Sequence, residues 1–74
     1  MGSSEHRIVS RLDEVLQERG MTLTELSRET GLTMANLSVL KNGHAKAVRF
    51  SSLTLICDAL GCTPADLLDI EPRG

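Results

Sequence analysis

Residues 22–43, TLTELSRETGLTMANLSVLKNG, contain two short segments with apolar residues at helical spacing, separated by Gly31-Leu32-Thr33. Thr22 and Thr33 each stand just before one of these segments, where a side-chain hydroxyl can accept a hydrogen bond from a free N–H of the first helical turn. Glu25 follows Thr22 at the spacing of a capping box, and a glycine stands where each segment ends. The stretch therefore predicts two helices, near residues 23–30 and 34–42.

A short glycine-containing turn between two short helices is typical of a helix-turn-helix, in which the second helix projects from the body of the domain. The small side chain of Ser27 suits the close approach of the two helices. The residues expected to face inward and hold the second helix rigidly are Leu26, Thr30, Leu37 and Leu40. A plain helical hairpin in a small bundle has the same spacing, so both interpretations remain open at this point.

The same local pattern, an apolar residue, then Ser or Thr, then a second apolar residue, recurs at Phe50-Ser51…Leu55 and Cys62-Thr63…Leu67. Pro64 and Asp66 follow Thr63, and both are favourable in a first helical turn. The glycines that stand where helices are expected to end are Gly20, Gly31, Gly43 and Gly61. Apolar stripes at helical spacing are formed by Ile8, Leu12, Val15 and Leu16 and by Leu53, Ile56, Cys57 and Leu60.

Together these signals predict an all-α fold of five helices, near residues 5–19, 23–30, 34–42, 52–60 and 64–69. No alternating pattern typical of a strand is present. The 74 residues suffice for one small domain, which we expect to span residues 5–70, with a flexible N-terminus at residues 1–4 and a short tail at residues 71–74. Phe50 is the only aromatic residue, so the core must be aliphatic.

Charge is unevenly distributed, although the formal net charge is only −2. Residues 33–56 contain no Asp or Glu but carry Lys41, Lys46 and Arg49, which gives this segment a charge of +3. Residues 57–71 carry only acidic charges. Because a local potential, rather than the total charge, steers a polyanion, the first segment predicts a basic surface and the second a solvated acidic end.

The sequence lacks the features that define membrane, secreted, metal-binding and catalytic proteins. Charges interrupt every apolar stretch, so neither a membrane span nor a secretory signal is expected, and the cytoplasm is the default location. Cys57 and Cys62 are expected to be small buried residues rather than a disulfide, and with His6 and His44 they do not have the spacing of a metal site. No nucleophile-and-base cluster and no glycine-rich phosphate loop is present, so we expect no enzymatic activity, no cofactor and no small-molecule substrate.

Residues 22–43, together with RFSSLTLICDALGCTPADLL at residues 49–68, resemble the lambda-repressor/Cro type of helix-turn-helix domain, also called the XRE family. The similarity is greatest to small single-domain members that read LS-LKNG-AKA-RF-TL-IC-ALGC-P-DLL, and it covers residues 8–70. The resemblance implies a five-helix, lambda-repressor-like domain that binds double-stranded DNA through the helix at residues 34–42. It also implies a transcription regulator, and we expect a repressor that acts by occupying its site.

The resemblance further implies roles for individual residues. The residues expected to read bases lie on the second helix of the motif: Met34, Ala35, Asn36, Ser38 and Val39. The residues expected at the DNA backbone are Thr22, Leu23, Thr33, Lys41, Asn42, His44, Lys46 and Arg49. Because one recognition helix covers only a few base pairs, family members commonly bind as twofold dimers, and the candidates for a homodimer contact are Val9, Leu55, Leu68 and Ile70. Simple packing within the core is an equal alternative for each of these four.

Three positions depart from the family pattern. Leu23 stands where a glutamine often braces the base-reading side chains, Met34 replaces the expected polar reader, and Val39 stands where a polar or basic residue is common. The reading face is therefore unusually apolar and offers no Arg or Gln for a bidentate base contact. Apolar side chains can instead contact thymine methyl groups, and DNA shape can supply further specificity. The same apolar face leaves a second function open, a protein-interaction module of the antitoxin kind on a helix-turn-helix scaffold.

Overall fold

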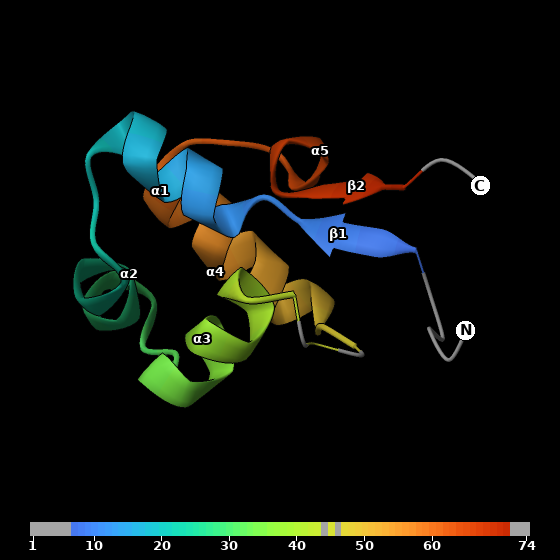
Figure 1. Ribbon diagram of the computed structural model, residues 1–74. Coiled ribbons are helices and arrows are strands. Elements are labelled where there is room, and N and C mark those ends of the chain that lie inside the picture. Colours follow the sequence, from blue (N-terminus) through green and yellow to red (C-terminus); the bar gives the residue numbers. More distant parts are fainter. Residues whose placement is uncertain (1–6, 44, 46, 72–74) are drawn as a thin grey trace.

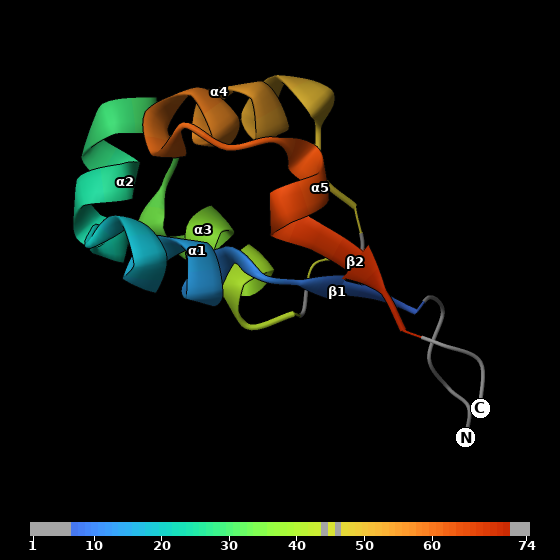
Figure 2. The same cartoon turned by 90° about the horizontal axis from the view of Figure 1, so that it is seen from above.

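The computed structural model describes residues 7–43, 45 and 47–71, and it confirms a mostly helical fold with five helices (Figure 1). In chain order the elements are β1 (Ile8–Ser10), α1 (Leu12–Arg19), α2 (Leu23–Thr30), α3 (Met34–Lys41), α4 (Phe50–Leu60), α5 (Pro64–Leu67) and β2 (Leu68–Ile70). The two strands extend from the bundle at the end opposite α2 (Figures 1 and 2). Within the described residues, no helix is both long enough and apolar enough to cross a membrane.

A two-stranded sheet is the main departure from the sequence-based expectations. The helix predicted at residues 5–19 begins only at Leu12, because residues 8–10 pair antiparallel with residues 68–70. The same pairing ends the helix predicted at residues 64–69 at Leu67. Ile8 is consequently exposed rather than part of the α1 stripe. Strands of three residues are too short to show an alternating pattern, and each depends on a partner at the other end of the chain, so no local signal marked them.

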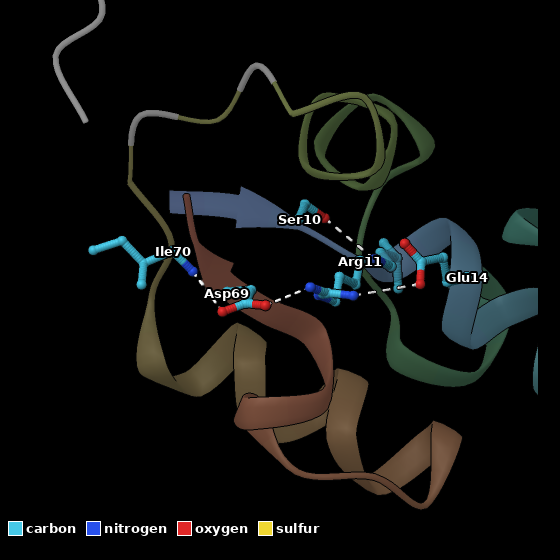
Figure 3. A network of polar contacts seen from close by, with 6 residues as sticks. Ser10, Arg11, Glu14, Asp69 and Ile70 are labelled. Atoms are coloured by element: carbon cyan, nitrogen blue, oxygen red, sulfur yellow. Dashed lines mark hydrogen bonds and ion pairs between the residues drawn. The ribbon is translucent and has the colours of Figure 1, made fainter. Parts of the chain in front are cut away.

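Polar contacts fasten the sheet to the start of α1 (Figure 3). The Arg11 guanidinium pairs with the Asp69 carboxylate on β2 and lies 3.6 Å from the Glu14 carboxylate one turn along α1. The backbone N–H of Arg11 donates to the Leu67 carbonyl at 2.6 Å, and the Ser10 hydroxyl accepts the Leu12 N–H at 3.3 Å. The beginning of α1 is therefore held by the end of α5 and by β2.

Three of the four predicted helix starts are confirmed, since Thr22, Thr33 and Thr63 stand at the N-caps of α2, α3 and α5. At α5 the Asp66 carboxylate accepts the Thr63 N–H at 3.0 Å and the Thr63 hydroxyl at 3.2 Å. The helix predicted near residues 52–60 is also present, but the predicted N-cap at Ser51 is wrong. The helix begins at Phe50, with Arg49 at an N-cap that has no side-chain hydrogen bond. Phe50 is 87% exposed, so it does not form the expected hydrophobic staple.

The core is aliphatic, and most of it comes from the predicted inward faces of α1 to α4. Its buried residues are Leu12, Val15, Leu16, Leu26, Leu37, Leu40, Leu53, Ile56, Cys57, Leu60 and Leu67. Thr30, also predicted to face inward, is half-buried. Cys57 and Cys62 are free thiols at the end of α4, where the Cys62 N–H donates to the Cys57 carbonyl at 3.1 Å. Burial, and then the neighbouring Cys57, raise the pKa of the Cys62 thiol. Cys57 is buried as predicted, whereas Cys62 is only half-buried and packs against the core.

Candidate nucleic-acid interface

Side chains of α2 hold the turn that leads into α3. The Ser27 hydroxyl donates to the Leu32 carbonyl at 2.6 Å. The Thr30 hydroxyl donates to the Leu26 carbonyl at 2.8 Å and accepts the Leu32 N–H at 3.2 Å. Gly31 has a φ of +77°, in the left-handed region that glycine adopts without a steric cost. These hydrogen bonds and this backbone conformation fix the direction in which α3 leaves α2.

The five residues expected to read bases lie on one side of α3. Leu37 and Leu40 are buried on the other side, where α3 packs against α1 and α2. Since successive residues of an α-helix are about 100° apart, the outward arc is centred on Ala35 and Val39, with Met34 and Ser38 on the flank toward Leu37 and Asn36 on the flank toward Leu40. Ser38 is half-buried, and the other four are exposed. The outward arc is therefore mostly apolar, with Met34 43% and Val39 44% exposed.

The two threonines expected at the DNA backbone orient the helix starts. The Thr33 hydroxyl accepts the Asn36 N–H at 3.1 Å, and the Thr22 hydroxyl accepts the Glu25 N–H at 3.1 Å. The Glu25 carboxylate in turn accepts the Thr22 N–H at 2.9 Å, and this bond is the main cause that lowers the pKa of Glu25. The capping box predicted from the sequence is thus complete, with its carboxyl group ionised at neutral pH.

Leu23 and Asn42 lie at opposite ends of the motif. Leu23, the first residue of α2, is half-buried and packs against the core. Leu23 is therefore a partly buried packing residue and not a fully exposed interface residue. Asn42 is exposed at the C-cap of α3, where its N–H donates to the Ser38 carbonyl at 2.9 Å.

Lys41 is held by a residue that the sequence did not indicate. Its Nζ lies 3.8 Å from the Asp13 Oδ1 on α1, and Gln17 donates to the other carboxylate oxygen of Asp13 at 3.3 Å. The Lys41 side chain is only 35% exposed. Asp13 has no local sequence relation to Lys41, and the pair forms because α1 and α3 pack together, so only the fold brings this negative charge to the interface.

Arg49 is exposed at the start of α4, beside the outward arc of α3. A groove of about 510 Å³ between α3 and the start of α4 is lined by Asn36, Val39, Arg49 and Ser52, among others. Sequence reasoning did not single out Ser52. The other two basic candidates of this segment, His44 and Lys46, lie outside the described residues. Arg49 is therefore the basic candidate that the structure brings next to the expected base-reading residues.

The four candidates for a dimer contact do not share one face. Because successive strand residues point to opposite sides of a sheet, Val9 lies on the face opposite Leu68 and Ile70. Leu68 and Ile70 line a hollow of about 650 Å³ with Ile8, Leu40 and Val48, among others. Leu55 lies on α4 and is 43% exposed.

The acidic groups of residues 57–71 lie on elements other than α3. Asp66 is on α5 and Asp69 on β2, and α5 and α3 lie at opposite edges of the molecule in Figure 1. The Ile70 N–H and then Arg11 lower the pKa of Asp69, and the Thr63 N–H lowers that of Asp66. These carboxylates are therefore ionised at neutral pH. Among the residues that the structure describes, no three potential metal-ligating side chains gather in one place.

The tight turn, the buried inner side of α3 and its exposed outer side define a helix-turn-helix domain of the DNA-binding kind. Residues 11–73 match the family model described as the Cro/C1-type HTH DNA-binding domain, and the chain belongs to this family. This match confirms the resemblance found in the sequence.

Two known proteins show the extent of the similarity. The chain is 55% identical over 62 residues to the HTH-type transcriptional regulator YozG of Bacillus subtilis (strain 168), an alignment that covers 84% of this chain and 74% of that protein. Its fold is similar to that in a crystal structure of the transcriptional regulator VanUg, with a TM-score of 0.75 and 22% sequence identity over 99% of this chain and 96% of the other. YozG is named a transcriptional regulator, and the similarity to VanUg concerns the fold.

Proposed function

We propose that this protein is a sequence-specific transcription regulator that binds double-stranded DNA by inserting α3 into the major groove. The observation that carries the proposal is the outward arc of α3, which is exposed while Leu37 and Leu40 anchor the helix from the other side. The major groove is wide enough to admit an α-helix, and the hydrogen-bonded turn at Gly31 holds α3 in one orientation.

The charge around α3 supports the same proposal. Residues 33–56 contain no acidic residue, and exposed Arg49 stands next to the outward arc. Phosphate contacts supply much of the affinity of such proteins and make it dependent on salt. Lys41, Lys46 and Arg49 are the residues that we assign to the phosphates, and they are few, so a single copy is expected to bind weakly.

We therefore infer that the protein binds as a twofold homodimer on two half-sites about one helical turn apart. The apolar face formed by Ile8, Leu68 and Ile70 supports a contact between two copies, because Ile8 and Ile70 pair across the strands and both are exposed. The five helices form a single bundle, and α2 and α3 of this bundle form the helix-turn-helix. We infer that the bundle represses by occupying its site and excluding the polymerase.

Selection of bound sites from a random duplex DNA library, followed by sequencing, tests this proposal. An enriched inverted repeat is expected for the unmodified protein. Lys46→Glu combined with Arg49→Glu is expected to abolish binding with unchanged helicity. Undiminished binding by the double variant would refute the assignment of Lys46 and Arg49 to the DNA phosphates.

A second candidate function follows from the exposure of Met34 and Val39. The outward arc of α3 would then bind a protein partner by burial of apolar surface. Such binding survives high salt, because apolar burial is not screened in the way that phosphate contacts are. No enriched duplex, together with salt-resistant binding of a protein that Met34→Glu abolishes, would favour this second function.

A further inference from the structure

The chemistry that α3 presents to a DNA groove is narrow. Of its outward residues, Met34, Ala35 and Val39 carry only apolar groups, and two carry groups able to form hydrogen bonds with base edges, Asn36 and Ser38. Ser38 is half-buried. Lys41 is the only charged residue of the helix, and it lies beside the Asp13 carboxylate. The centre of the arc, at Ala35 and Val39, can therefore make only van der Waals contacts.

One group in the major groove of unmodified DNA matches such a surface. The edges of the four base pairs present hydrogen-bond donors and acceptors, and the single apolar group among them is the C5-methyl of thymine. Burial of a methyl group against an apolar side chain is favourable, whereas burial of a donor or acceptor there without a partner is costly. An apolar arc therefore favours thymine at the positions that it touches.

The surroundings of the arc favour DNA over a protein as its occupant. Val39 lines the same groove as exposed Arg49 and the polar side chains of Asn36 and Ser52. The described residues that line this groove include no acidic residue, and the Asp13 carboxylate brought to α3 by the fold pairs with Lys41 at the end of the helix. An apolar strip bordered by basic and hydroxyl groups is complementary to a groove floor with methyl groups between two phosphate backbones.

We propose that α3 selects its DNA sites by C5-methyl groups in the major groove, those of thymine and equally those of 5-methylcytosine. The proposal rests on the proposed DNA-binding function and specifies what that interface reads. Met34, Ala35 and Val39 form the methyl-contacting surface, and Asn36 supplies the polar contact at its edge. Cytosine methylation at a contacted position would then increase affinity, because 5-methylcytosine places a methyl group where thymine has one.

The test uses the enriched duplex from the selection, with single positions changed. Replacement of a contacted thymine by deoxyuridine removes only the methyl group and is expected to weaken binding by about fourfold per methyl. Replacement of that thymine–adenine pair by cytosine–guanine should weaken binding further, and methylation of the new cytosine at C5 should restore about fourfold of the loss. Thymines outside the half-sites serve as controls and should tolerate deoxyuridine.

A protein variant links the effect to α3. Val39→Ser removes both methyl groups of a side chain that is 44% exposed, so folding should be little affected. In this variant deoxyuridine at the position facing residue 39 should no longer weaken binding. Selective binding of the duplex with equal affinity for thymine and deoxyuridine at every position would overturn the methyl proposal and leave the DNA-binding function intact. Failure to enrich any duplex would overturn the DNA-binding function itself, and the methyl proposal with it.

Discussion

The two ends of the molecule are built by different means. At the turn end, which comprises α2, α3 and the turn between them, the hydrogen bonds that set the helix starts and the turn join residues close in sequence, such as Thr22 with Glu25 and Ser27 with Leu32. At the sheet end, which comprises β1, β2 and the start of α1, contacts join opposite ends of the chain, such as Arg11 with Asp69. The turn end also has fully buried leucines beneath it, whereas Ile8 and Ile70 of the sheet are exposed.

This difference indicates which end contributes most to stability. Apolar burial is the dominant favourable contribution to folding, while ion pairs at the surface contribute little. We therefore expect the turn end to be rigid and the two strands of the sheet end, whose Ile8 and Ile70 are exposed, to contribute weakly to stability. A rigid turn end suits the presentation of α3 to DNA, because a reading surface must keep its geometry.

Leu26→Ala tests this comparison with the largest expected effect. The Leu26 side chain is fully buried, and truncations of this kind cost about 2–5 kcal/mol. Ile70→Ala at the sheet end shortens a side chain that is 54% exposed, and it should cost about 0.5 kcal/mol or less. Urea denaturation followed by circular dichroism measures both. Equal losses at the two positions would contradict the unequal contribution of the two ends.

Gly31→Ala should have the next largest effect. A Cβ at Gly31 meets no atom within 4 Å, so the cost comes from the left-handed backbone alone and should be about 1–2 kcal/mol. Gly31→Asn is the matched control, because asparagine tolerates this conformation better than alanine. Thermal unfolding of both variants distinguishes a cost of the left-handed backbone from a cost of too little space for a side chain. A larger loss in the asparagine variant would show that space, and not backbone conformation, limits the turn.

The same contrast explains how much of the fold was predictable. The starts of α2 and α3, their ends and the buried leucines between them follow from capping residues and helical periodicity, which operate within a few residues. The strands were missed because each has only three residues and exists through its partner at the far end of the chain. The hydroxyl of Ser51 predicts a cap there and a helix from residue 52, but α4 begins at Phe50 without a side-chain cap.

In the candidate DNA-binding site, too, some features follow from the local sequence and others only from the packing of the helices. The outward position of Met34, Ala35 and Val39 followed from periodicity, since it depends only on which residues face the core. The approach of Asp13 to Lys41 depends on how α1 packs against α3. No spacing in the sequence relates these two residues. Their pairing changes the expected contribution of Lys41 to phosphate binding.

A double-mutant cycle on Asp13 and Lys41 tests that contribution. Asp13 competes with a phosphate for Lys41, so Asp13→Asn should tighten DNA binding by about two- to fivefold, the size expected for an exposed pair. Lys41→Met should weaken binding more in the Asp13→Asn background than in the original protein. Glu18→Gln, the same charge change on the exposed side of α1, is the control. Equal effects of Lys41→Met in both backgrounds would show that Asp13 does not restrain the lysine.

The smallest expected effect concerns the pKa values of two carboxyl groups, Asp69 at the sheet end and Glu25 at the turn end. The pKa of each is lowered by a backbone N–H, that of Ile70 for Asp69 and that of Thr22 for Glu25, and Arg11 lowers the pKa of Asp69 further. Since the folded state favours both charged forms, their stabilisation is complete above the unfolded pKa values of about 4 and is lost as the pH falls through the lower folded values.

Arg11→Ala distinguishes the two ends in this titration. It should raise the pKa of Asp69 part of the way to its ordinary value, because the Ile70 N–H remains, and it should leave the pKa of Glu25 unchanged. Carboxyl carbon shifts followed by NMR between neutral and acidic pH measure both groups in one sample. An unchanged Asp69 would mean that the backbone of β2 alone holds this carboxylate. A shift of Glu25 as well would mean that loss of the sheet anchor reaches the turn end, and the two ends would then not be independent.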